Sequence, residues 1–121
     1  MPKTFLDLVS DAKARIHEVT VDDVKRIVAE GGPETIVDIR EESEWANGHL
    51  PGATHLSRGV LEVRVAKVFP DPSAPLVLYC GGGNRSALAA DVLRVMGYTN
   101  VSSLAGGWRG WNAAGGPVER S

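Results

Sequence analysis

An apolar run that ends at the only cysteine of the chain is the feature that most constrains the fold. Residues 76–80, LVLYC, have the continuous apolar character of a central strand in a parallel sheet. Three glycines follow at 81–83, and apolar residues then recur at helical spacing until Gly97. A buried strand, a glycine turn and a helix in this order indicate an α/β fold.

The rest of the chain repeats this alternation of short apolar runs and helical patterns. We predict further strands at 16–19, 35–39, 53–56 and 101–104, helices at 4–15, 21–30, 59–68 and 107–114, and a helical turn at 41–47. The expected fold is α/β, with a mainly parallel central sheet of about five strands and helices on both faces. Because 121 residues suit one core, we divide the chain into an N-terminal helical extension, 1–14, and one domain, 15–121.

Composition excludes several functions. The formal net charge of -2 leaves no basic excess for a nucleic acid partner. No apolar run approaches the roughly 18 to 20 residues of a membrane span, and the charged start is unlike a signal peptide, so we expect a cytoplasmic protein. One cysteine excludes an internal disulfide, and His17, His49 and His55 lack metal-ligand spacing, so we expect no metal site.

The loop CGGGNRS places a thiol at the carboxyl end of a strand, the edge where open parallel sheets bind ligands. Glycines allow successive backbone N–H groups to converge on one point, beside the positive end of a helix. These donors and the Arg85 cation should lower the pKa of Cys80, and Ser86 should cap the helix. The alternative is a core cysteine beside an ordinary glycine turn. A P-loop is excluded because the segment has no lysine.

Three segments in the right order resemble the rhodanese superfamily, specifically its small single-domain sulfurtransferases. They are VDIREESEWANGHLPGATHLSRG, CGGGNRS and LAGGWRGWNAAGGPV, within a resemblance that spans residues 15–120. The resemblance implies a single rhodanese-like domain with Cys80 as nucleophile and sulfur carrier, and with no metal or organic cofactor. It implies a substrate cradle of Gly81, Gly82, Gly83, Asn84, Arg85 and Ser86.

Four other residues match the family pattern with two readings each. Arg58 lies either near the mouth of the site, where it attracts a substrate anion, or on the solvated surface. The resemblance suggests that Asp38 and Arg40 support the loop, and the alternative is a structural ion pair. For His49 we expect a hydrogen bond that supports the fold, and the alternative is a part in the chemistry.

The resemblance implies that Cys80 takes sulfur from thiosulfate or another small anionic donor and passes it to a thiol or cyanide acceptor. The thiol acceptor is either a small molecule or a thioredoxin-like protein. A non-enzymatic sulfur relay or a regulatory binding module remains an alternative. A phosphatase or arsenate reductase is disfavoured, because four residues separate Cys80 from Arg85 whereas those enzymes resemble Cys-x5-Arg.

Overall fold

A five-stranded sheet forms the centre of the protein. The computed structural model describes residues 1–120. The strands are β1 (His17–Val19), β2 (Thr35–Asp38), β3 (Thr54–His55), β4 (Leu76–Tyr79) and β5 (Val101–Leu104). Their order is β1-β5-β4-β2-β3 and every neighbouring pair is parallel, which confirms the expected fold class.

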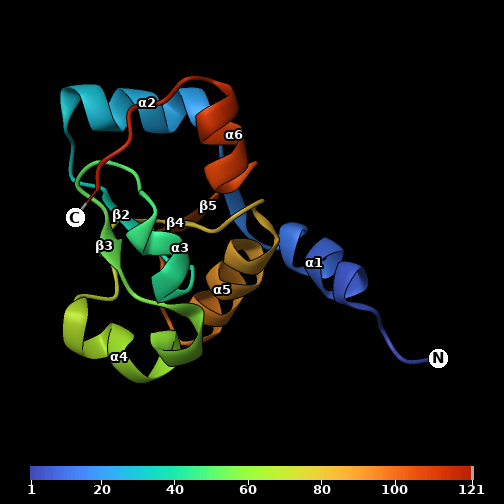
Figure 1. Ribbon diagram of the computed structural model, residues 1–121. Coiled ribbons are helices and arrows are strands. Elements are labelled where there is room, and N and C mark those ends of the chain that lie inside the picture. The colour runs from blue at the N-terminus through green and yellow to red at the C-terminus, as the bar shows by residue number, and fades with distance from the viewer. Residues whose placement is uncertain (121) are drawn as a thin grey trace.

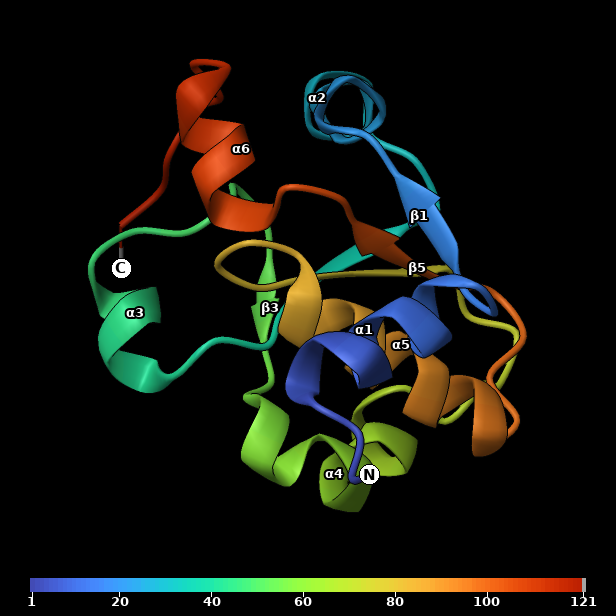
Figure 2. The same cartoon turned by 90° about the vertical axis from the view of Figure 1, so that its right-hand side faces the viewer.

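Helices cover both faces of this sheet, as expected. They are α1 (Phe5–Lys13), α2 (Val21–Glu30), α3 (Glu42–Ala46), α4 (Leu61–Val68), α5 (Asn84–Val95) and α6 (Gly107–Ala113), with a 3-10 turn, η1 (Arg58–Val60). Figures 1 and 2 show α2 and α6 on one face, and α4, α5 and α1 on the other. β4 lies in the middle of the sheet, between β5 and β2.

The alternation of side chains along β4 determines which face of the sheet Cys80 points to. Val77 and Tyr79 pack into the core beneath α2 and α6, whereas Leu76 and Leu78 pack into the core beneath α4 and α5. Because successive side chains of a strand point to opposite faces, Cys80 continues the second series and belongs to the α4 and α5 core.

Local signals place the helix ends. Before α2, Thr20 Oγ1 accepts the Asp23 N–H at 3.1 Å, and the Asp23 carboxylate accepts the Thr20 N–H at 2.9 Å. The helix ends at Gly31, whose φ of 76° lies in the left-handed region that glycine tolerates. These are the start and stop that the sequence predicts.

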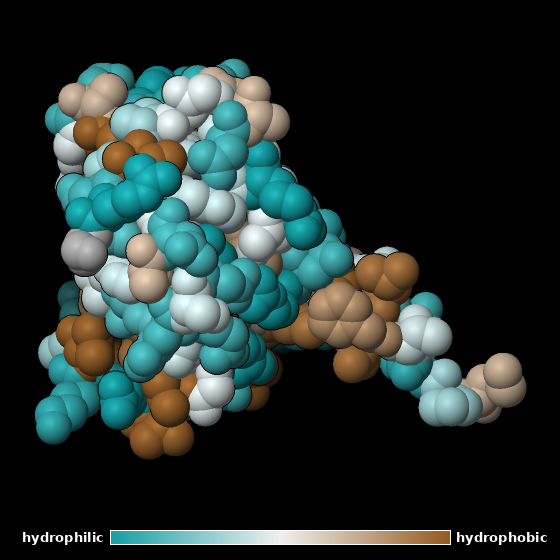
Figure 3. Space-filling view, in the orientation of Figure 1, coloured by the Kyte–Doolittle hydropathy of each residue, from teal (hydrophilic) through white to brown (hydrophobic). Residues whose placement is uncertain are grey.

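The predicted N-terminal helix is present as α1 and packs along α5. Its Val9 and Ala12 are buried. Phe5, Leu6 and Leu8 are 51%, 65% and 47% exposed, and Figure 3 shows brown apolar surface gathered over this helix. The division of the chain at residue 14 stays a prediction. In residues 1–120, no helix has the length and apolar character needed to cross a membrane.

Candidate active site

The Cys80 sulfur sits in a small cradle of hydrogen-bond donors at the carboxyl end of β4. The backbone N–H of Gly83 points at Sγ from 3.1 Å, and the N–H of Ser86 points at it from 3.4 Å. The Ser86 Oγ lies 3.5 Å from the sulfur. The expected convergence of amides on the sulfur is therefore found.

This arrangement favours the thiolate. Burial raises the pKa of the Cys80 thiol, but the Ser86 hydroxyl and the backbone N–H groups of Ser86, Gly83 and Gly82 lower it, and the net pKa lies below the ordinary value. Since the thiolate is the reactive form of cysteine, this environment increases the reactivity expected of Cys80.

The helix cap differs from the prediction. Gly83, not Ser86, is the N-cap of α5, and its φ of 97° requires glycine. Ser86 lies inside the first turn, fully buried, where its Oγ is 2.8 Å from the Ser103 Oγ. The Ser86 hydroxyl therefore lies beside the Cys80 sulfur and does not cap the N-terminus of α5.

A cavity of about 270 Å³ opens onto the cysteine loop. It is lined by Phe5, Cys80, Gly81, Gly82, Asn84, Arg85 and Arg109. Cys80 itself is only 1% exposed, so its sulfur lies deep in the wall of this cavity rather than on its rim. Phe5 and Arg109 line the cavity although the sequence did not predict them as site residues.

Arg85 lines the cavity, but its charge is shared with a carboxylate. Its Nη1 and Nη2 lie 3.1 and 3.2 Å from the two carboxylate oxygens of Glu44 in α3. The Glu44 hydrogen bonds contribute most to raising the pKa of Arg85, burial opposes this, and the Cys80 thiolate adds a smaller rise. The Arg85 cation was expected to help the backbone donors lower the pKa of Cys80, and the groups that lower this pKa most are the Ser86 hydroxyl and the backbone N–H groups.

Asp38 and Arg40 form a buried ion pair next to the site. Arg40 Nε and Nη2 lie 3.1 and 2.8 Å from Asp38 Oδ2, and Nη2 also donates to the Gly48 carbonyl at 2.7 Å. The Tyr79 hydroxyl donates to Asp38 Oδ2 at 2.5 Å. The guanidinium lies over the Trp108 ring at 4.5 Å. Because neither charged residue lines the cavity, these contacts fit the structural reading.

His49 also fits a role in the fold. Its Nδ1 lies 3.0 Å from the Leu50 carbonyl oxygen, and its ring stacks on Trp45 at 3.5 Å. Arg58, predicted near the mouth of the site, does not line the cavity with Cys80, and its Nη1 pairs with Glu62 at 2.6 Å. A part for Arg58 in attracting an anion stays a prediction.

The start of α6 is fastened to the cysteine loop. The N–H groups of Trp108 and Arg109 donate to the carbonyls of Cys80 and Gly81 at 2.8 and 2.9 Å. A Cβ on Gly107 would lie 2.4 Å from the Cys80 carbonyl oxygen, so this close approach requires glycine. Figure 2 shows the loop after β4 lying against the start of α6.

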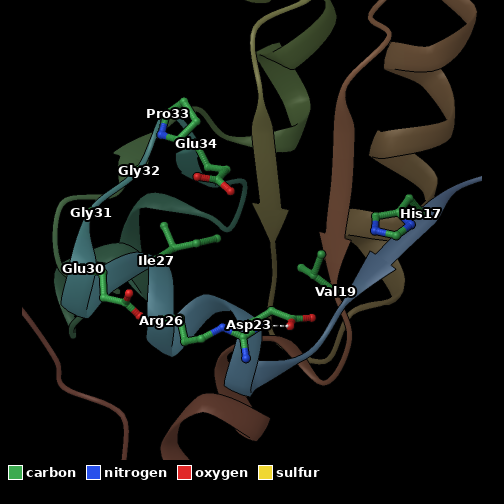
Figure 4. A pocket seen from close by; sticks show the side chains of 10 residues that line it. All are labelled: His17, Val19, Asp23, Arg26, Ile27, Glu30, Gly31, Gly32, Pro33 and Glu34. Atoms are coloured by element: carbon green, nitrogen blue, oxygen red, sulfur yellow. Dashed lines mark hydrogen bonds and ion pairs between the residues drawn. The ribbon is translucent and has the colours of Figure 1, made fainter.

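A larger hollow, of about 500 Å³, lies away from the cysteine. Figure 4 shows its walls, made by α2, the segment 30–34 and β1, with Asp23 paired to Arg26. None of the predicted site residues lines it. It carries no nucleophile comparable to Cys80, so the smaller cavity is the candidate active site.

The fold and this cradle define an α/β domain that holds a cysteine thiol among hydrogen-bond donors at the carboxyl end of a central strand. The family model of the rhodanese-like domain matches residues 20–114, and the chain belongs to that family. It is 38% identical over 85 residues to a thiosulfate sulfurtransferase of Pseudomonas entomophila, covering 70% of this chain and 74% of the relative. It is 30% identical to a thiosulfate:glutathione sulfurtransferase of Saccharomyces cerevisiae, covering 85% and 83%. Sequence and fold together support a sulfurtransferase.

Other relatives are longer or carry a different description. The chain spans 54% and 59% of the length of two Bacillus subtilis relatives, one of them named as a candidate sulfur carrier. A Rhodopseudomonas palustris structure, described as of unknown function and a possible tyrosine phosphatase, superposes with a TM-score of 0.89 at 33% identity. That match covers 98% of this chain and 99% of the other.

Proposed function

We propose that the protein transfers sulfane sulfur from thiosulfate, or a related persulfide donor, to a thiol or cyanide acceptor through a persulfide on Cys80. The observation that carries this proposal is the set of polar groups around one sulfur: two backbone N–H groups donate to Sγ, and the Ser86 hydroxyl lies 3.5 Å from it, in position to donate once the thiol has lost its proton. A thiolate and a persulfide anion both need such donors, and the two species differ by one sulfur atom.

The proposed reaction has two halves. In the first, the Cys80 thiolate attacks the outer sulfur of thiosulfate, an S–S bond forms to Cys80, the original S–S bond breaks, and sulfite leaves with the electron pair. In the second, the acceptor attacks the terminal sulfur of the persulfide and the Cys80 thiolate leaves with its electron pair. Ping-pong kinetics follow, because the enzyme carries the sulfur between the two substrates.

The proposed substrate cradle is residues 81–86. The Gly83 N–H donates to the sulfur, the Ser86 hydroxyl is placed to donate to the thiolate, and Gly81, Gly82, Asn84 and Arg85 form part of the cavity wall. The small size of the cavity suits a compact donor. We further propose that the protein works in the cytoplasm, where a lone reactive thiol stays reduced between turnovers.

Phosphate ester hydrolysis is the less favoured alternative. Four residues separate Cys80 from Arg85, and the guanidinium of Arg85 is engaged with Glu44. Among residues 1–120, no Asp or Glu lines the cavity to protonate a leaving alkoxide. Thiol attack on sulfane sulfur needs no such acid, since sulfite is a stable leaving anion.

Thiosulfate:cyanide turnover by the wild-type protein and Cys80→Ser tests the proposal. We expect thiocyanate formation by the wild type and none above background by the variant. Equal rates for the two proteins would overturn the assignment. If sulfur loads on Cys80 but is not passed to cyanide, the alternative of sulfur relay to a partner protein is supported instead.

A further inference from the structure

We infer that Arg109 binds the anionic head group of the sulfur donor while the outer sulfur of that donor faces Cys80. This inference rests on the proposed function and deepens it, because it names the feature of the donor that the site selects. Arg109 stands in α6, far along the chain from the cysteine loop, and nothing in the CGGGNRS segment indicates it.

The backbone holds Arg109 directly beside the loop. Its N–H donates to the Gly81 carbonyl at 2.9 Å, and the preceding Trp108 N–H donates to the Cys80 carbonyl at 2.8 Å. These two bonds fix the first turn of α6 against the loop. The Arg109 side chain consequently lines the same cavity as Cys80.

The side chain lies across a glycine that leaves room for it. A Cβ on Gly82 would be 2.0 Å from Arg109 Nη2 and 3.0 Å from Cζ. Gly82 does not have a positive φ, so its backbone conformation does not require glycine. The missing side chain instead lets the guanidinium lie close over the loop.

Of the two cations that line the cavity, Arg109 is the one without a carboxylate partner among the described residues. Arg85 is engaged with Glu44, and outside the cavity Arg58 is paired with Glu62 and Arg40 with Asp38. Within residues 1–120, the Arg109 guanidinium makes no ion pair or hydrogen bond, and no carboxylate lines the cavity. Its five donors remain available to a ligand.

The donor class follows from this placement. The amides and Ser86 receive the sulfur that reacts, and Arg109 receives a negative group a short distance away. A planar guanidinium matches a sulfonate or carboxylate with two parallel hydrogen bonds. We therefore assign the site to donors whose sulfane sulfur lies next to a compact anionic group, over uncharged donors of similar size.

Alkylation of Cys80 tests the anion site without any sulfur transfer. Iodoacetate and iodoacetamide both form an S–C bond to the Cys80 thiolate and expel iodide, but only iodoacetate carries a negative charge. For Arg109→Gln we expect the iodoacetate rate to fall about tenfold, with the iodoacetamide rate within about twofold of wild type. Arg109→Lys should retain part of the preference, because it keeps the charge but loses the planar fork.

Arg64→Gln is the matched control, since Arg64 is exposed on α4 and outside the cavity, and it forms no ion pair with any of the residues 1–120. The same variants are assayed with thiosulfate, where Arg109→Gln should raise KM about tenfold and leave kcat nearly unchanged.

Two outcomes would overturn the inference. One is an iodoacetate to iodoacetamide rate ratio in Arg109→Gln equal to that of wild type, and the other is a ratio lowered equally in Arg64→Gln. If the wild type gains no sulfur from thiosulfate, the proposed function fails, and the alkylation ratio still judges the anion site.

Discussion

The Ser103 hydroxyl lies 2.8 Å from the Ser86 hydroxyl, and both side chains are fully buried. When Cys80 is a thiolate, Ser86 has to donate its proton to the sulfur, because a thiolate has none to give. The oxygen of Ser86 can then accept the proton of Ser103. Ser103, which is far from the loop in sequence, thus contacts the hydroxyl that faces the Cys80 sulfur, and we expect it to position that hydroxyl.

Replacing Ser86 should make Cys80 less reactive at low pH. Ser86→Ala removes the hydroxyl that contributes most to lowering the pKa of Cys80, so the pKa should rise. A higher pKa leaves less thiolate at any pH below it, and the iodoacetamide rate there should fall about tenfold. The pH profile of alkylation measures this, and the rate at high pH should be unchanged.

Ser103→Ala should also raise the pKa of Cys80, but by less than Ser86→Ala, because Ser103 contacts the sulfur only through the Ser86 hydroxyl. Ser102→Ala is the matched control, because Ser102 precedes Ser103 in β5 and points to the opposite face. A pH profile for Ser86→Ala identical to that of wild type would contradict the account of the cradle.

Alanine substitutions at two glycines with positive φ compare the cost of backbone strain alone with the cost of strain and close packing together. Gly97→Ala, at φ 101° with open space around it, should cost about 1 to 2 kcal/mol of unfolding free energy. Gly83→Ala, at φ 97°, should cost more, because its Cβ would lie 3.1 Å from the Gly106 nitrogen. It should also slow sulfur loading of Cys80, since the Gly83 amide moves. Denaturant unfolding and loading rates measure the two effects, and equal behaviour of the variants would contradict the prediction.

The buried ion pair should matter for stability far more than a surface pair. Arg40→Ala leaves the buried Asp38 carboxylate without its partner and should lower the free energy of unfolding by about 3 to 5 kcal/mol. Arg58→Ala breaks the more exposed pair with Glu62 and should cost about 0 to 1 kcal/mol. Urea unfolding of both variants makes the comparison. Similar losses would show that the Asp38 pair is not a structural element.

Removing residues 1–14 tests whether α1 is an extension or part of the core. Without it, the face of α5 that covers Val9 and Ala12 becomes exposed. We expect the 15–121 chain to fold with a lower Tm, because the sheet and its other helices remain intact. Failure to fold would show that α1 belongs to the domain, and an unchanged Tm would show that its packing on α5 contributes nothing.

Much of the fold could be read from the sequence because its signals are local. The apolar runs predicted all five strands, and the helical pattern over 21–30 predicted α2 at its observed bounds. Cys80 at the end of a buried strand followed from the same reasoning. The prediction that Ser86 caps α5 was wrong, because Gly83 takes a left-handed conformation as the N-cap and Ser86 lies in the first turn of the helix.

The rest of the site depends on which strands are neighbours in the sheet. The alternation of strands and helices along the sequence does not predict that order. β5 lies beside β4, which brings Ser103 and Arg109 to the cysteine loop. The GGWRGW motif after a strand was a usable signal for Arg109, since it begins at the same edge of the sheet. The pairing of Arg85 with Glu44 and the entry of Phe5 into the cavity depend on tertiary packing alone.

Mass spectrometry after exposure to thiosulfate tests the central claim most directly. The wild-type protein should gain the mass of one sulfur atom, located on the peptide that contains Cys80, and a reductant or cyanide should remove it. Cys80→Ser should gain nothing under the same conditions. A wild-type protein that takes up no sulfur, or a variant that takes up as much, would contradict the claim that this cradle holds a persulfide.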